Sequence, residues 1–328
     1  ETFMVAPVSR PKQNLFELDF VPICFAPLVN VFNGACAVAW RVFAVAFCGA
    51  SVCILRFANF SHSELLTWGA YSALIFLSFA TSFGGMFDQN IGPFSFGVSL
   101  LISMVFACLV TFGIALFLHH FVFERLSRKA GHMTMVFASF GVALILRHLV
   151  VLIWGSDPIY FSNDLQFAVL LPGNIRVMPD QVFLLCLTIV VVVILHLFMT
   201  RTRTGIAMRG VSESPDLARI SGVNVRVIIN CVWLIGASGA ALGGVLYGLT
   251  VQLRPELGFG LILPLFAAAI LGGAGSLYGA VIGGLIVGIS ENLSVMIIPT
   301  NYKPAVPFLL ILAILYCRPQ GLFGERPQ

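Results

Sequence analysis

Long runs of apolar residues, separated by short polar segments, restrict this chain to very few folds. A run of about 20 apolar residues can cross the roughly 30 Å hydrocarbon layer of a membrane as one helix. Hydrophobic residues make up 59% of the 328 residues and charged residues only 10%, so a soluble protein of this composition could not cover its surface with polar groups. An ordinary cytosolic enzyme, a disordered chain and a nucleic-acid-binding protein are therefore excluded. We expect an all-α, polytopic integral membrane protein with about eight to ten transmembrane helices, some of them broken or re-entrant.

Six spans follow from the apolar runs: 63–82, 95–118, 133–154, 181–199, 227–250 and 304–317. Two other runs are ambiguous. The run 20–55, interrupted by Arg41, fits either one span at about 33–55 after an interfacial segment, or a span at 20–40 followed by a short second one. The run 261–298 is too long for one helix, and the glycines at 272–275 predict a break. Whether 261–275 crosses the membrane or re-enters stays open.

The distribution of Lys and Arg predicts the orientation of the spans. The alternating loops 121–132 and 200–226, together with the tail 318–328, hold ten Lys and Arg residues, and the loops on the opposite side hold three. Cytoplasmic loops carry the excess of positive charge in membrane proteins. We therefore expect these three segments to face the cytoplasm and the loop 155–180 to lie outside.

The loop 200–226 contains the signals of a short capped helix. Ser214 is a candidate N-cap, Pro215 fits the first helical position, and Asp216 adds negative charge to the first turn. Gly222 is a natural stop. One edge of this helix would be apolar: Leu217, Ile220 and Val223. The segment is interpreted either as a docking element for a cytoplasmic partner or as a plain connector.

Glycines recur at a spacing of four residues between 237 and 290. The GxxxG pairs stand at 239/243, 244/248, 275/279, 279/283 and 284/288. Such spacing lets helix backbones approach closely in membranes. It favours a tightly packed helical core, with a glycine-lined passage or hinge as the alternative.

Polar residues inside or beside the spans are the candidate functional groups. Segment 56–64 carries Arg56, Asn59, His62 and Glu64, and it is either a turn at the membrane surface or a broken helix that lines a passage. Ionisable residues within spans are functional candidates by default, although pairing inside the protein explains them equally well. Two further pairs belong to this group: Arg147-His148 and Glu291-Asn292.

Motifs that would give the chain chemistry of its own are missing from the sequence. It has no GxxxxGK[ST] nucleotide-binding loop, no GxSxG nucleophile motif and no TVGYG filter. The eight cysteines form no CxxC pair and lie mostly in apolar runs, so we interpret them as core residues and expect no metal site. We expect a protein that is not an enzyme and that takes energy from a partner.

At several places the residues resemble the permease subunits of bacterial ABC importers for branched-chain amino acids and related amides. The likeness is to the first of the two paired permeases of that system. Residues 56–65, RFANFSHSEL, with Gly69-Ala70-Tyr71 after them, are similar to the family's R-x-x-N-F-A-H-G-E-L and G-A-Y, with Ser61 and Ser63 in place of Ala and Gly. Further similar stretches are 141–146 (GVALIL), 202–209 (TRTGIAMR), 218–225 (ARISGVNV), 271–276 (LGGAGS), 279–284 (GAVIGG) and 318–324 (RPQGLFG).

The resemblance implies an assembly. The chain would pair with a second permease, two cytoplasmic ATPase subunits and a periplasmic substrate-binding protein in the bacterial inner membrane. It would hold no cofactor itself, since ATP and Mg would be bound by the ATPase subunits. It implies a permease domain at 31–324, after an N-terminal extension or interfacial segment at 1–30 and before a tail at 325–328.

Roles for single residues also follow from the resemblance. The loop 200–226 would carry the coupling helix that is seated in a groove of one ATPase, with contact residues Arg209, Glu213, Ser214, Pro215, Asp216, Leu217, Ala218, Arg219 and Gly222. A passage for a small zwitterion would be lined by weak polar groups, for which the candidates are Asn59, Ser61, His62, Glu64, Arg147, Glu291 and Asn292.

Other functions stay open at this point. An ion-coupled secondary transporter would use Glu64 and Glu291 as its intramembrane acids. An intramembrane enzyme would need a nucleophile and base, which the sequence does not show at usable spacing. Branched-chain amino acids are the expected solute of an importer, with urea or short amides and aromatic acids as alternatives.

Overall fold

The computed structural model describes residues 47, 59–82, 96–127, 131–161, 169–171, 175–273, 277–318 and 320–323. The predicted N-terminal segment 1–30 and the tail 325–328 lie outside the described residues, and so does nearly all of the ambiguous run 20–55.

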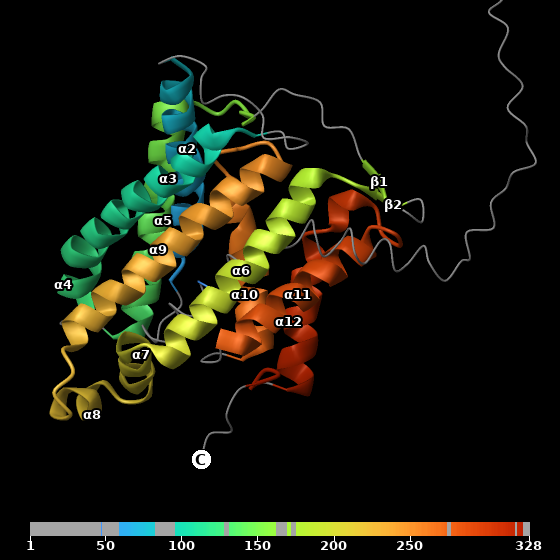
Figure 1. Cartoon of the computed structure of the whole chain (residues 1–328). Coiled ribbons are helices and arrows are strands. Elements are labelled where there is room, and N and C mark those ends of the chain that lie inside the picture. Colours follow the sequence, from blue (N-terminus) through green and yellow to red (C-terminus); the bar gives the residue numbers. More distant parts are fainter. Residues whose placement is uncertain are drawn as a thin grey trace, which may run out of the picture.

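The described elements are mostly helices (Figure 1). In chain order they are α2 (Ser61–Ser82), α3 (Val98–Leu118), the π-helix η1 (His119–Phe123), α4 (Glu124–Ser127), α5 (His132–Trp154), β1 (Val169–Leu171), β2 (Ile175–Val177), α6 (Pro179–Arg201), α7 (Arg203–Glu213), α8 (Pro215–Ile220), α9 (Val225–Thr250), α10 (Leu257–Gly272), α11 (Leu277–Ser294), the 3-10 helix η2 (Thr300–Tyr302) and α12 (Ala305–Cys317).

Long apolar helices confirm the expected polytopic membrane protein. Among the described residues, four helical stretches are long and apolar enough to cross a membrane: Val98–Ser127, Met133–Trp154, Pro179–Arg201 and Val225–Thr250. The helix α2 has 22 residues, and α10, α11 and α12 are shorter apolar helices. The total of eight to ten spans stays a prediction, because part of the chain is not described.

The helix α3 does not end at residue 118, where the polar residues that follow predicted a loop. It runs on through η1 and α4 to Ser127. His119 and Phe123 are both buried in this extension, and their ring centroids lie 5.5 and 5.4 Å from that of Trp233 on α9. A π-turn holds one more residue than an α-helical turn, so the side chains after it point in a different direction around the helix axis. Contact with α9 explains why the segment is helical despite its polar residues.

The segment between α5 and α6 holds a small hairpin that the all-α prediction did not contain. The strands β1 and β2 pair antiparallel, with Val169 opposite Val177. Ile159, just after α5, forms a single bridge with Leu253, just after α9. Pro179 is the first residue of α6, where proline is favoured because the missing N–H would have no helical partner.

Two ends of the helix bundle can be distinguished. The helices α4, α7 and α8 lie at one end, and the hairpin lies at the other (Figure 1). Arg226 at the start of α9 pairs with Glu124 of α4 at 2.7 Å at the first end. Arg147 near the end of α5 pairs with Glu256 just before α10 at 2.7 Å at the second. The described parts of the Lys- and Arg-rich segments thus gather at one end, as the predicted topology requires.

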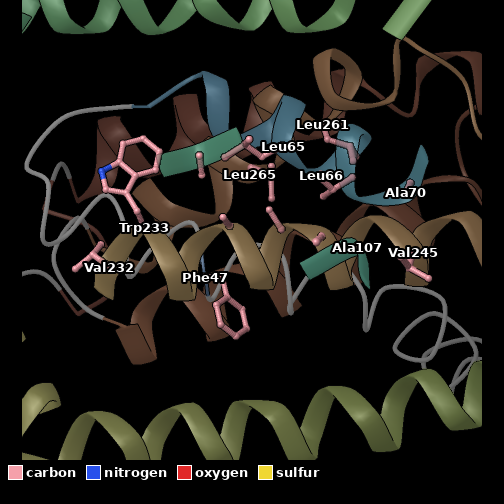
Figure 2. Packing of buried hydrophobic residues seen from close by; sticks show 14 of the residues in the cluster. Phe47, Leu65, Leu66, Ala70, Ala107, Val232, Trp233, Val245, Leu261 and Leu265 are labelled. Atoms are coloured by element: carbon pink, nitrogen blue, oxygen red, sulfur yellow. The ribbon is translucent and has the colours of Figure 1, made fainter. Parts of the chain in front are cut away.

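Glycines allow the central helices to touch through their backbones. A methyl group on Gly244 of α9 would overlap the carbonyl oxygen of Leu66 on α2. A methyl group on Gly283 of α11 would overlap the carbonyl oxygen of Ala268 on α10. The glycine spacing therefore serves close packing at these contacts. Around them, side chains from α2, α3, α9 and α10 form one apolar cluster (Figure 2).

The predicted break between α10 and α11 is confirmed and is held by the chain's C-terminal segment. Gly273 ends α10 with a φ of 102°, a conformation that favours glycine. The free carbonyl groups of Leu271 and Gly272 accept hydrogen bonds from the amides of Leu322 and Phe323, at 2.9 and 3.1 Å. Two of the glycine-containing segments that the sequence analysis singled out therefore meet in space.

The packing at Gly244 gives a first test. Gly244→Ala should lower the free energy of unfolding by ~1–3 kcal/mol, because the methyl group forces α2 and α9 apart. Thermal unfolding of the detergent-solubilised protein measures this loss. Gly113→Ala in α3 is the control, since a methyl group there meets nothing within 4 Å. Equal unfolding temperatures for the two variants would contradict the role of Gly244 in packing.

Candidate functional site

The start of α2 is a polar segment buried inside the bundle. Asn59, Ser61, His62, Ser63 and Glu64 are each at most 4% exposed. The Asn59 side-chain oxygen accepts hydrogen bonds from the Ser61 amide (3.1 Å) and the Ser61 hydroxyl (2.6 Å). Such a side-chain turn satisfies amides that a helix start leaves free. The described part of segment 56–64 is therefore a helix start in the protein interior.

The same segment packs against the middle of two other helices. The Phe60 amide donates to the Ser139 hydroxyl of α5 at 3.2 Å. The Phe60 ring lies 4.8 Å from Phe266 of α10 and 5.9 Å from Phe140 of α5, between ring centroids. The helix α2 therefore begins partway along the bundle and runs from there toward the end that holds the hairpin.

Buried polar atoms without a hydrogen-bond partner are concentrated on this stretch. Within the described part of the chain they include the Asn59 Nδ2, the His62 Nε2, both carboxyl oxygens of Glu64 and the Tyr71 hydroxyl. Nearly all buried polar atoms in proteins are hydrogen-bonded, so each exception calls for an explanation. Water or a transported solute can supply the missing partners at a path through a membrane protein.

Helical spacing divides these groups between two faces of α2. Glu64, Thr67 and Tyr71 follow one another at three and four residues and share a face, whereas His62 lies on another face. The Gly258 amide, in the first turn of α10, donates to the Thr67 hydroxyl at 2.9 Å. A methyl group on Gly258 would lie 2.9 Å from the carboxyl carbon of Glu64. The Glu64 face is thus covered by the start of α10.

Arg147 of α5 joins the same region. Its guanidinium group donates to the Glu256 carboxylate at 2.7 Å and lies 5.0 Å from the centroid of the Phe259 ring. The Arg147 side chain is 21% exposed and that of Glu256 is 71% exposed. Arg147 also acts electrostatically on Glu64. One turn of chain, 256–259, therefore contacts both the buried acid and the arginine.

Aromatic rings border the Glu64 face. The Trp154 ring at the end of α5 lies 5.1 Å from Tyr71 and 5.9 Å from Trp68, between centroids. The Trp68 indole N–H donates to the Leu146 carbonyl at 3.1 Å, which fixes the ring against α5. The site therefore combines aromatic rings with the charged groups of Glu64 and Arg147.

The remaining predicted path residues lie elsewhere. Glu291 is buried near the end of α11, and the Asn292 side chain accepts from the Lys303 ammonium group at 3.4 Å. The helix α11 packs mainly on α10 and α12. The structure thus brings Glu64 and Arg147 together, places Asn59, Ser61 and His62 on the same helix start, and leaves Glu291 and Asn292 apart. Sequence analysis did not count Glu256, Phe259 or Tyr71 among the candidate path residues, because only tertiary packing brings them to this place.

The capped helix predicted in the loop 200–226 is confirmed as α8. The Ser214 hydroxyl accepts from the Leu217 amide at 3.4 Å, and Pro215 opens the helix. Asp216 pairs with Arg219 at 3.1 Å. Gly222 has a φ of 82°, and the Val223 amide closes the end on the Ala218 carbonyl at 3.0 Å.

The exposure of α8 differs between its two sides. Ala218 is buried, whereas Leu217 is 66% exposed and Ile220 is 84% exposed. Two of the three predicted edge residues therefore form an outward apolar surface at the end of the bundle that carries the basic segments.

A second helix, α7, precedes α8 and was missed by sequence analysis, although Arg209 and Glu213 on it were named. Thr202 caps it, with its hydroxyl accepting from the Gly205 amide at 3.0 Å. A methyl group on Gly205 would overlap the backbone of α6 at Phe198, so the two helices touch directly. Met208 and Val211 are buried on α7, and their spacing of three residues was the available signal.

The connection from α8 to the rest of the bundle is short and well held. Asn224 caps α9, accepting from the Val227 amide at 3.4 Å, and Arg226 pairs with Glu124 of α4. A cavity of about 560 Å³ lies beside this connection, between α4 and the start of α9. The helix α9 packs along α2 and α3, so α8 is linked to the polar start of α2 through one continuous helix.

Comparison with known proteins gives consistent matches over most of the chain. A family model described as branched-chain amino acid transport system, permease component, matches residues 37–315. The chain is 28% identical over 286 residues to the high-affinity branched-chain amino acid transport system permease protein BraD of Pseudomonas aeruginosa, covering 84% of this chain and 88% of the relative.

Two further relatives show the range of the similarity. The corresponding permease protein LivH of Escherichia coli is 28% identical over 280 residues, again 84% and 88% of the two chains. The D-allose transport system permease protein AlsC of Escherichia coli is 30% identical over 184 residues, which are 53% of this chain and 54% of the relative. No solved structure matches the chain.

The end of α8 provides a second test. Gly222→Val should strain the chain by ~1–2 kcal/mol, because a side chain disfavours the left-handed conformation, and α8 should unfold locally more often. Faster tryptic cleavage after Arg219 in the purified protein measures this opening. Gly210→Ala on α7, where a methyl group meets nothing within 4 Å, should leave the cleavage rate unaltered. The same slow cleavage in both variants would show that Gly222 does not hold the helix.

Proposed function

Because the chain belongs to the family of branched-chain amino acid transport system permease components, we propose that it is the membrane-spanning subunit that forms the solute path of an ATP-driven importer. The observation that supports this path is the group of buried polar atoms without hydrogen-bond partners between Asn59 and Tyr71, just before and within the first half of α2. In hydrocarbon such atoms are costly, and a path for water and polar solute gives them a use.

The solute we propose is a branched-chain amino acid. The relatives BraD and LivH are named for branched-chain amino acid transport, whereas AlsC is named for D-allose. Related permeases thus serve different solutes, and we assign the main selection to a periplasmic binding protein. Urea, short amides and aromatic acids remain the alternative solutes.

Energy would enter through α8. Its exposed Leu217 and Ile220 offer an apolar surface that suits a groove of an ATPase subunit. Caps at both ends keep α8 rigid, so that it transmits displacement. The motion would pass through Asn224 and Arg226 into α9 and from there to α2. ATP and Mg would be bound by the ATPase subunits, and this chain would catalyse no reaction.

The assembly we propose has a second permease, two ATPase subunits and a binding protein. The excess of Lys and Arg at the end of α4, α7 and α8 supports a cytoplasmic position for that end. The hairpin end would then face the periplasm and the binding protein. The membrane would be the bacterial inner membrane.

Transport by the purified assembly tests the proposed function. The tagged chain should co-purify with two ATPase subunits and a second permease. In proteoliposomes supplied with the binding protein, the assembly should take up radiolabelled L-leucine only when ATP is present on the side of the ATPases. Uptake that survives without ATP and collapses with the proton gradient would instead show an ion-coupled transporter that uses Glu64 and Glu291.

The apolar surface of α8 provides a separate prediction. Ile220→Asp should reduce the amount of co-purifying ATPase more than tenfold, because an apolar side chain contributes about 1.5–3 kcal/mol when buried and a charge in its place is unfavourable. Ile297→Asp is the matched control, since Ile297 is 87% exposed against 84% for Ile220 and follows α11 at the opposite end. Equal ATPase recovery from both variants would refute docking through α8.

A further inference from the structure

The carboxyl group of Glu64 is in an unusual environment for an acid. It is fully buried, and neither of its oxygens has a hydrogen-bond partner in the described residues. An isolated carboxylate is strongly disfavoured away from water unless a cation approaches it. Gly258 leaves room for this group only because it has no side chain. The chain therefore covers a carboxyl group that has no hydrogen-bond partner of its own in the described residues.

Arg147 lies near Glu64, but its ion pair is with a different acid, Glu256. Its partner Glu256 is 71% exposed, so water can solvate the Glu256 carboxylate when the two groups separate. The guanidinium group would then be available to bind another carboxylate. Its flat donor arrangement suits a carboxylate in particular.

The turn 256–259 sets the two groups beside each other. Glu256 and Phe259 contact Arg147, and Gly258 contacts Glu64. A negative and a positive side chain thus face the same few residues at the start of α10, from α2 and α5 respectively. Such a pair matches the two charged groups that every α-amino acid carries on its α-carbon.

We propose that Glu64 and Arg147 form a binding site for a zwitterionic α-amino acid on the solute path. Glu64 binds the α-ammonium group and Arg147 binds the α-carboxylate group. In the present conformation the Glu256 carboxylate occupies the place of the solute carboxylate on Arg147. The inference rests on the proposed function, and it assigns the solute class to residues of this chain.

The neighbouring rings fit the rest of such a solute. Tyr71 shares the Glu64 face, and Trp154 and Trp68 extend it. An aliphatic side chain would lie against these rings, and an ammonium group is attracted to an aromatic face. Urea and neutral amides would leave both charges unpaired. Aromatic acids without an amino group would leave Glu64 unpaired.

Entry to the site requires the first turn of α10 to move. Gly258 and its hydrogen bond to Thr67 cover Glu64, and Phe259 lies over Arg147. Exchange of Glu256 for the solute on Arg147 would release this turn. Glu256 is thus a residue that holds the closed state and does not itself bind the solute.

Uptake of L-leucine by the full importer in proteoliposomes, with its binding protein, tests the proposal. Glu64→Gln and Arg147→Met should each lower the maximal uptake rate more than tenfold per assembled complex. Glu64→Asp and Arg147→Lys keep the charges and should recover a large part of the rate. Glu256→Gln should transport at least as fast as the unaltered chain, because it removes a competitor for Arg147.

Glu256→Gln separates the proposal from a structural role of the ion pair. If Glu256→Gln lowers uptake as much as Arg147→Met does, the pair itself is what matters and the proposal is wrong. The proposal is also overturned if Glu64→Gln and Arg147→Met transport at the unaltered rate, or if Glu64→Asp and Arg147→Lys are as slow as the neutral variants. ATP-dependent uptake by the unaltered chain would in those cases leave the proposed function intact, whereas its absence would remove that function itself.

Discussion

The absence of water in the hydrocarbon layer is the constraint on which this structure depends. Every backbone amide and carbonyl must find a partner inside the protein, which is why the described spans are helices. Close backbone packing then supplies the attraction that apolar side chains cannot, since lipid is as apolar as they are. Gly244 against α2 and Gly283 against α10 are the clearest cases. Where α10 stops, the amides of Leu322 and Phe323 satisfy the carbonyl groups that the helix end leaves free.

The start of α2 is an exception to the rule that polar groups in the membrane find partners inside the protein. This helix begins in the protein interior. The Asn59 side-chain oxygen accepts a hydrogen bond from the free Ser61 amide, while the Asn59 side-chain nitrogen has no hydrogen-bond partner. A protein optimised for stability alone would place apolar groups there. The polar groups of α2 lie on the face that the start of α10 covers and on the first turn beside it.

Local signals in the sequence predicted much of the fold, and tertiary contacts account for most of what they missed. Apolar runs located α2, α5, α6, α9 and α12 within a few residues, and Ser214, Pro215 and Gly222 predicted α8 because capping depends on neighbours along the chain. The extension of α3 and the pair formed by Arg147 with Glu256 depend on residues about a hundred positions away, so no local pattern contained them. Sequence analysis named Glu64 within the family motif and Arg147 as an ionisable residue within a span, but only the turn at Gly258 shows that they face one site.

The arrangement also explains how distant events can reach the same site. The rigid α8 continues through the Asn224 cap into α9, and α9 touches α2 through Gly244 without side chains between them. Backbone contact of this kind leaves little room to absorb a displacement, because packed interiors transmit strain. In the proposed function, a movement of α9 would shift α2 relative to α5 and α10. The ion pair of Arg147 with Glu256 lies at the start of α10, next to the Gly258 turn that covers the buried acid.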